Sequence, residues 1–209
     1  AALKYVVYGG VSSGVMLYGF SLIYGLTGTL DLFEVSNRIA AQGGLDLTLF
    51  LAATMSMAGF GYKAFKIRIW RPDPMDDVKA IRQIRSRLGD KDKVEIMLDR
   101  TGDTSGENWD EATGLRVADA LYEADAQWLE EPFVRGDVER HARLRAASKI
   151  PITGGEHQPL DVYDDYLQGQ SFDIIQPHCA NVLLHLKKIA GAAELFGVDC
   201  IFHGSHGLD

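Results

Sequence analysis

The stretch DEATGLRVADALYEADAQWLEEP at residues 110–132 decides the fold, because it holds one complete helix-and-strand unit of a kind that recurs along the chain. Residues 110–123 are predicted to form a helix, and residues 127–131 a short strand that ends in two glutamates. Similar units follow one another from residue 64 to residue 203. Their regular alternation with short connections is typical of a parallel sheet covered by helices.

This rhythm predicts the order of the elements. Strands are expected at residues 64–69, 94–98, 127–131, 150–154, 172–176 and 200–203, and helices at residues 76–88, 110–123, 138–147, 160–167 and 182–196. The pattern favours an α/β fold of the (β/α)8 TIM-barrel type, incomplete at about six strands, over an open doubly wound sheet. No glycine-rich phosphate-binding motif follows a predicted strand, which disfavours dinucleotide binding.

Acids and bases gather at the predicted strand ends. Functional sites of TIM-type barrels lie at the carboxyl ends of the strands. There, or on the first strand, the chain places Lys66, Arg68, Asp99, Glu130, Glu156, His178 and His203. Side chains alternate along a strand, so Lys66 and Arg68 share one face, and Ile67 lies on the other. We expect these polar side chains to converge.

Three carboxylates at successive strand ends predict a hard, oxygen-rich metal site. Asp99, Glu130 and Glu156 suit Mg²⁺ better than zinc, since no cysteine or histidine cluster is expected beside them. Lys66 on one side and His203 on the other could then move protons at a carbon atom. Taken singly, each residue is more often a helix cap, a turn former or an exposed side chain. Their order along the strands favours the site.

The first 62 residues have a different composition. Residues 5–26 contain no Asp, Glu, Lys, Arg or His and are long enough for a transmembrane helix, which needs about 20 residues. Residues 45–62 form a second, shorter apolar stretch that contains Asp46. We therefore expect one or two transmembrane-like helices over residues 1–62, with membrane contact through both apolar stretches. A barrel domain is expected over residues 63–209.

Charge and cysteine content exclude some functions. A formal net charge of −8 without a Lys/Arg-rich run argues against nucleic-acid binding. Cys179 and Cys200 have neither the spacing of metal ligands nor the density of a disulfide scaffold, and are expected to be free thiols in a reducing compartment. The barrel domain is therefore predicted to be cytoplasmic, and the whole chain to be at a membrane if its N-terminal helices insert.

Two N-terminal motifs are shared with a membrane family. Leu22-Ile23-Tyr24-Gly25-Leu26-Thr27-Gly28 and Met57-Ala58-Gly59-Phe60-Gly61-Tyr62-Lys63 are similar to segments of subunit N of bacterial NADH-quinone oxidoreductase, respiratory complex I. The resemblance implies that Lys4 and Lys63 belong to a proton path. Alternatively, Lys4 near a helix end reaches the membrane interface and has no such role.

A second set of motifs covers residues 61–209. It consists of Lys66-Ile67-Arg68, Met97-Leu98-Asp99, Trp128-Leu129-Glu130-Glu131-Pro132, Gly154-Gly155-Glu156 and Asp173-Ile174-Ile175-Gln176-Pro177. This set resembles the enolase superfamily, in its mandelate racemase and muconate-lactonizing branch. The resemblance implies that Mg²⁺ binds to Asp99, Glu130 and Glu156, and that Lys66 and His203 transfer protons on opposite faces. Glu130 is expected as the ligand ahead of Glu131, both from strand parity and as the first acid of its motif.

The same resemblance implies a reaction. Removal of the proton α to a substrate carboxylate would give an enediolate held by Mg²⁺. Loss of a β-hydroxyl would follow in a sugar-acid dehydratase, and reprotonation in a racemase or epimerase. We expect dehydration of a sugar acid, because His203 can protonate a leaving hydroxyl. Arg68 replaces a lysine of the family and His178 an aspartate, and both are expected to contact the substrate.

Three interpretations stay open. The first interpretation is an enzyme with impaired turnover, because the chain lacks the capping domain and terminal barrel strands that the family has. Homo-oligomers are usual in that family. The second is a membrane fragment of complex I subunit N involved in proton translocation. The third is a fusion or assembly artefact without evolved function, with its seam at residues 61–63.

Overall fold

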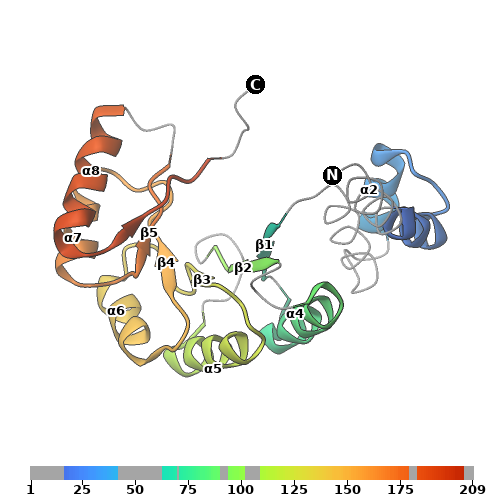
Figure 1. The fold of residues 1–209 in the computed structure, drawn as a ribbon, viewed down its shortest axis with the longest axis horizontal. Helices are drawn as coiled ribbons and strands as arrows, with labels where there is room; N and C mark the ends of the chain where they lie inside the picture. The colour runs from blue at the N-terminus through green and yellow to red at the C-terminus, as the bar shows by residue number, and fades with distance from the viewer. Residues whose placement is uncertain are drawn as a thin grey trace, which may run out of the picture. The chain divides into compact units, whose positions relative to one another are not determined.

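The computed structural model describes residues 17–41, 63–69, 71–89, 94–101, 109–178 and 183–204 (Figure 1). The chain divides into two compact units. One comprises Ala1–Phe65 with Ala80–Val94, and the other, the C-terminal unit, comprises Lys66–Lys79 with Glu95–Asp209. The boundaries pass through strand β1 (Ala64–Arg68) and helix α4 (Pro74–Leu88).

The first unit contains two helical segments near the N-terminus. Residues 17–27 are helical, and α2 spans Leu32–Ala41. Asp31 begins α2, since its carboxylate accepts a hydrogen bond of 3.0 Å from the backbone N–H of Glu34, as is usual at a helix N-terminus. Glu34 pairs with Arg38 one turn later at 3.3 Å.

The predicted membrane spans fall only partly on described residues. Within the described ranges, none of the helices combines the length and apolar character that crossing a bilayer requires. Lys4, residues 5–16 of the first predicted span and the whole of the second, residues 45–62, lie outside the described residues. Lys63 is described, and its side chain is exposed just before β1.

The strands form one sheet in sequence order. Its members are β1, β2 (Glu95–Asp99), β3 (Leu129–Glu130), β4 (Ile152–Gly154), β5 (Ile174–Ile175) and β6 (Asp199–Cys200). Each pair from β2 to β6 is parallel. The predicted α/β fold with strands in this order is therefore confirmed, although most of the strands are shorter than expected. Cys200 is a free cysteine, as predicted, whereas Cys179 lies outside the described residues.

Helices cover the outer face of this sheet in the C-terminal unit. They are α5 (Glu111–Glu123), α6 (Val138–Ala147), α7 (Val162–Gln168) and α8 (Leu183–Phe196), and Figure 1 shows them outside the arc of β2 to β6. Two of them are capped by aspartate side chains: Asp110 accepts from the N–H of Thr113 at 2.7 Å, and Asp137 from that of Arg140 at 3.1 Å.

The sheet core consists of aliphatic residues in register. Leu98 pairs with Leu129, which pairs with Ile152, and all three side chains are fully buried. Burying each side chain of this size contributes roughly 1.5–3 kcal/mol to the free energy of unfolding. The residues that follow them along the strands carry the polar groups of the site, because side-chain direction alternates.

Candidate metal and proton-transfer site

The register of the sheet brings the predicted acids to one edge. Asp99, the last residue of β2, is the register partner of Glu130, the last residue of β3, which in turn pairs with Thr153. Glu156 follows β4 by two residues. His203 forms a parallel bridge with His178, and its N–H donates to the carbonyl oxygen of Pro177 at 2.9 Å. The predicted site residues of five neighbouring strands thus follow one another along the carboxyl edge.

Lys66 lies between two of these carboxylates. Its ammonium nitrogen is 2.8 Å from Glu130 Oε1 and 3.9 Å from Asp99 Oδ2. Asp99 also accepts from Arg68 at 3.2 Å and from the Thr101 hydroxyl at 2.5 Å. The Asp99 and Glu130 side chains are 6% and 1% exposed, so these charges are compensated by cations of the same site.

The adjacent acids Glu130 and Glu131 have different partners. Glu131 accepts from Arg135 Nε at 2.7 Å and from the backbone N–H groups of Gly155 and Glu156 at 3.3 and 3.1 Å. It thereby holds the loop that carries Glu156. Glu130 faces Lys66 instead. The geometry therefore supports the choice of Glu130 as the candidate ligand and gives Glu131 a structural role.

Burial shifts the proton affinities of this site. Burial raises the pKa of Glu130, with nearby Asp99 adding to the effect and Lys66 opposing it. Burial also raises the pKa of Glu131 to about 7, against the opposing charge of Arg135. The pKa of His203 is lowered, first by burial, while Glu156 acts in the opposite direction. Of these three groups, Glu131 can therefore hold or release a proton near neutral pH.

Two polar side chains that the sequence patterns did not single out also contact Glu130. The side-chain amide of Gln176 is oriented so that both its nitrogen and its oxygen form hydrogen bonds. The nitrogen donates to the two Glu130 carboxylate oxygens at 2.9 and 3.2 Å, and the oxygen accepts from the Thr153 hydroxyl at 2.7 Å. Trp128 Nε1 donates to Glu130 Oε2 at 3.4 Å. Gln176 follows β5 directly, so its position at a strand end could have marked it as a site residue. The sequence patterns selected charged side chains, and the amide of Gln176 is neutral.

Three histidines gather around Glu156. His157 Nε2 is 2.7 Å and His203 Nδ1 3.5 Å from Glu156 Oε1. The rings of His157 and His178 stack at 4.2 Å, and those of His178 and His203 lie 5.5 Å apart. The expectation that no histidine cluster would accompany the carboxylates is therefore wrong, because the loops after β4, β5 and β6 converge although they are distant in sequence.

The site also concentrates unusual backbone conformations. Thr101, Glu131 and His157 have φ angles of 49°, 44° and 54°, in the left-handed region that side chains disfavour. Each follows a strand and contacts or adjoins a carboxylate of the site. Strained backbone of this kind persists where the surrounding contacts enforce it, and it is frequent at functional sites.

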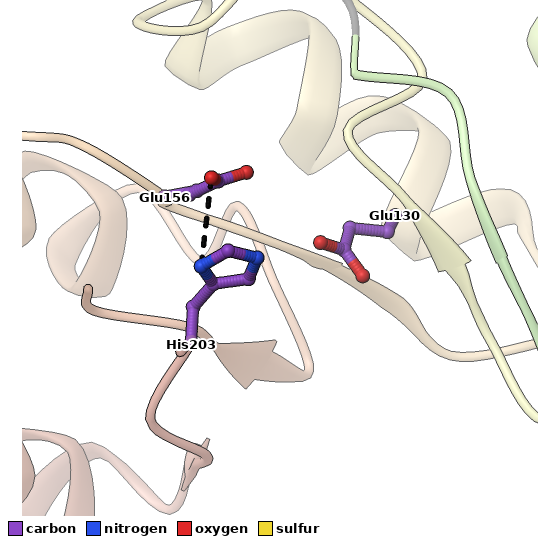
Figure 2. A group of neighbouring side chains, drawn as sticks. All are labelled: Glu130, Glu156 and His203. Atoms are coloured by element: carbon purple, nitrogen blue, oxygen red, sulfur yellow. Dashed lines mark ion pairs between the residues drawn. The ribbon is translucent and has the colours of Figure 1, made fainter. Parts of the chain in front are cut away.

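The residues present can hold a divalent cation. Glu130, Glu156 and His203 each offer a ligand atom, all within 4.8 Å of one another, and Figure 2 shows them approaching from three separate segments. Asp99 is the register neighbour of Glu130 and shares Lys66 with it. The carboxylates of Asp99, Glu130 and Glu156 are buried and offer oxygen ligands, which fits Mg²⁺. Arg68 contacts Asp99, and His178 is half-buried against His157.

Comparison with known families gives two matches. Residues 50–209 match the family described as enolase C-terminal domain-like, and residues 1–78 match the membrane family described as NADH:quinone oxidoreductase/Mrp antiporter. The chain is thus composite. The matches overlap at residues 50–78, which include the predicted seam at residues 61–63.

Individual relatives show the same division. The chain is 30% identical over 174 residues to 3,6-anhydro-alpha-L-galactonate cycloisomerase of Streptomyces coelicolor, covering 79% of this chain and 46% of that protein. It is 49% identical over 75 residues to NADH-quinone oxidoreductase subunit N of Chlorobium chlorochromatii, covering 35% of this chain and 15% of that protein.

A solved structure is similar in fold to the second part. It is L-talarate/galactarate dehydratase from Salmonella typhimurium, liganded with Mg and L-lyxarohydroxamate, with a TM-score of 0.67 and 25% identity. The similarity covers 76% of this chain and 40% of that one. The chain therefore spans less than half the length of each of these relatives.

Proposed function

Because the chain belongs to the enolase C-terminal domain-like family, we propose that its C-terminal unit binds Mg²⁺ and removes the proton α to the carboxylate of a sugar acid. The observation that carries this proposal is the placement of Lys66 between Asp99 and Glu130, with His203 beside Glu156 along the same sheet edge. A base on either flank of a carboxylate set is what stereospecific proton transfer at a carbon requires.

Asp99, Glu130 and Glu156 would hold the ion. When bound, Mg²⁺ supplies Lewis-acid stabilisation of negative charge on the substrate carboxylate. Gln176, Trp128 and Thr101 orient the carboxylates through their hydrogen bonds, which is the usual task of residues behind metal ligands.

Lys66 is the proposed proton acceptor. Its side chain is 31% exposed, so it reaches the carboxylates while remaining open to a substrate. In the ammonium form it pairs with Glu130, and in the amine form it accepts the α-proton. Arg68, which lies two residues further on the same strand face, is 55% exposed and is the proposed contact for a second substrate carboxylate.

His203 is the proposed partner on the opposite face. Burial lowers the pKa of His203, whereas the carboxylate of Glu156 acts in the opposite direction and favours the imidazolium form. For dehydration, a protonated His203 gives its proton to the departing β-hydroxyl, while the α-proton goes to Lys66. His178 would contact the substrate from the neighbouring strand end. Similarity to a sugar-acid dehydratase favours this outcome over reprotonation at carbon.

An exchange experiment tests the proposal. The full chain is incubated with galactarate and Mg²⁺ in deuterated water, and exchange of the α-proton is followed by proton NMR. We expect exchange that EDTA abolishes and that Lys66→Ala slows by about 10²–10⁴-fold. Lys79→Ala is the matched control, because Lys79 is an exposed lysine of α4 that pairs with exposed Asp76, and this variant should exchange at the unaltered rate. Absence of exchange from folded protein, or equal exchange by Lys66→Ala, would contradict the proposal.

The N-terminal match supports a different origin for residues 1–62. These residues have no role in the proposed proton transfer. A proton path through Lys4 and Lys63 remains a prediction, as does membrane contact through residues 5–26 and 45–62. Sequencing a transcript across residues 61–63 decides between a native fusion and an artefact, since only a native gene gives a continuous message.

A further inference from the structure

The cluster of Glu130, Glu156 and His203 differs from the three-carboxylate set in one ligand. These residues come from the ends of β3 and β4 and the segment after β6, and a ligand atom of each lies within 4.8 Å of the others (Figure 2). The cluster therefore combines two carboxylates with one imidazole. Asp99, the third predicted carboxylate, is not among its members.

Asp99 is engaged elsewhere. Arg68 Nη2 lies 3.2 Å and the Thr101 hydroxyl 2.5 Å from its two oxygens, and Lys66 approaches to 3.9 Å. His203, in contrast, offers a buried Nδ1 that makes no hydrogen bond within the described part of the chain. A buried imidazole nitrogen without a hydrogen-bond partner is costly, and a metal ion satisfies it.

One pair of ligand atoms in the cluster, from His203 and Glu156, already has the spacing of a small coordination shell. Ligand bonds of about 2.0–2.1 Å in a tetrahedral shell place neighbouring ligand atoms about 3.4 Å apart. The His203 Nδ1 to Glu156 Oε1 distance is 3.5 Å. His157 holds the same Glu156 oxygen at 2.7 Å and, at 54% exposure, fixes the carboxylate from outside the cluster.

Ligand chemistry then selects the ion. Imidazole suits zinc and other borderline ions, whereas Mg²⁺ prefers oxygen ligands. Two carboxylates neutralise one divalent ion, and Lys66 can withdraw from Glu130 because its side chain is long and 31% exposed. We propose that Glu130, Glu156 and His203 form a binding site for Zn²⁺ or a similar ion such as Co²⁺, which shares Glu130 and Glu156 with the three-carboxylate site and has His203 in place of Asp99.

This site has a regulatory consequence that rests on the proposed function. An ion on Nδ1 occupies the lone pair of His203 and displaces Mg²⁺ from Glu130 and Glu156. Zn²⁺ therefore inhibits proton transfer even when Mg²⁺ is present, and a chelator that prefers Zn²⁺ restores it. Binding itself does not depend on turnover, so it is measured separately.

Visible absorption of Co²⁺ provides the test. Metal-free full chain is titrated with CoCl₂, and we expect a d–d band that added Zn²⁺ removes. His203→Gln should weaken Co²⁺ and Zn²⁺ binding about 10–100-fold while leaving Mg²⁺ affinity unchanged. Asp99→Asn should do the reverse. His185→Gln on α8 is the matched control, since His185 lies outside the cluster, and it should bind like the unaltered chain.

Either of two results overturns the proposal: an unchanged Co²⁺ band in folded His203→Gln, or weaker Mg²⁺ binding in that variant to the same extent. If this variant does not fold, X-ray absorption of the Zn²⁺-loaded unaltered chain decides, because an imidazole in the shell supports the site and an all-oxygen shell contradicts it. A chain that binds Co²⁺ through His203 but exchanges no α-proton would refute only the proposed function.

Discussion

At the scale of single residues, the neighbouring glutamates Glu130 and Glu131 at the end of β3 have different roles. Glu130 and Glu131 are both 1% exposed, yet one contacts Lys66 and the other Arg135 and two backbone N–H groups. The left-handed φ of 44° at Glu131 turns the chain between them. One acid is therefore available to a cation, and the other fixes the loop of Glu156.

Glu131 makes stability depend on pH. Its folded-state pKa of about 7 lies above the ordinary value of 4.5, so between these values the folded chain holds a proton that the unfolded chain has lost. The free energy of unfolding therefore falls as pH rises from about 5 to 8, by on the order of 3 kcal/mol for a shift of this size.

Glu131→Gln should remove this fall. In urea titrations from pH 5 to pH 8, the stability of the variant relative to the unaltered chain is expected to rise with pH. Glu111→Gln is the control, because Glu111 is exposed, pairs with Arg143 and has a lowered pKa. The difference in free energy of unfolding between Glu111→Gln and the unaltered chain should not rise between pH 5 and pH 8. Parallel profiles for Glu131→Gln and the unaltered chain would show that burial does not control this carboxyl.

Sequence patterns pointed to the charged members of the candidate site but not to its neutral ones. Strand ends and motif resemblance pointed to Lys66, Asp99, Glu130 and Glu156, which do line one sheet edge. Gln176 and the histidine cluster were not predicted. An amide carries no charge that marks a site, and the approach of loops after different strands depends on tertiary packing.

At the scale of elements, local patterns determined the helices better than the strands. Helix α6 spans Val138–Ala147 as predicted, because Asp137 caps its first turn. Strands β3 and β5 have two residues each, against five predicted, since the flanking residues lie beyond the paired ladder. Apolar runs indicate where a strand passes through the core, but hydrogen bonding to its neighbours sets where it ends.

Helix packing gives opposite predictions for two glycines. A Cβ on Gly114 of α5 would lie 2.7 Å from the ring of Phe133, which is fully buried and cannot retreat. Gly191 of α8 has nothing within 4 Å of such an atom. Alanine stabilises a helix by about 1 kcal/mol relative to glycine. We therefore expect alanine to be destabilising at Gly114, where the added atom clashes, and stabilising at Gly191.

Denaturant titration of both variants checks this contrast. Gly191→Ala is expected to raise the free energy of unfolding by about 0.5–1 kcal/mol. Gly114→Ala is expected to lower it by about 1–3 kcal/mol, as overpacking usually does. An increase in stability for both would mean that α5 and Phe133 do not approach as closely as the structure has them.

At the scale of the whole molecule, exposed apolar residues gather on the last helix and directly after the last strand. They include Leu183, Leu184, Leu195, Phe196, Ile201 and Phe202, which are 45–88% exposed. β6 also stands at one end of the strand order, as β1 does at the other. Exposed apolar surface favours association of chains, so limited solubility is expected.

Leu195→Lys tests this expectation. Leu195 is 88% exposed, so the substitution should change the free energy of unfolding by no more than about 0.5 kcal/mol while raising the concentration at which light scattering begins. Leu186→Lys on the same helix is the control, since Leu186 is 6% exposed and its replacement should destabilise the chain by about 3 kcal/mol or more. If Leu195→Lys scatters light as the unaltered chain does, this surface does not limit solubility.

The chain matches two families, so one must ask which part of it carries the proposed metal-dependent chemistry. We assign the chemistry to the C-terminal unit, which contains Lys66 and every acid proposed to hold Mg²⁺. Residues 1–62 supply none of these groups. Metal binding by the whole chain should therefore depend on a few carboxylates at one sheet edge.

Calorimetric titration of the full chain with Mg²⁺ is the decisive measurement, with Glu130→Gln and Glu131→Gln as a matched pair. Both replace an acid that is 1% exposed, and they are adjacent in sequence. We predict one Mg²⁺ site in the unaltered chain, at least about tenfold weaker binding in Glu130→Gln, and a smaller loss in Glu131→Gln, whose amide oxygen can still accept from the Gly155 and Glu156 N–H groups. Equal loss in both folded variants, or undisturbed binding in Glu130→Gln, would contradict the assignment of the metal to this edge.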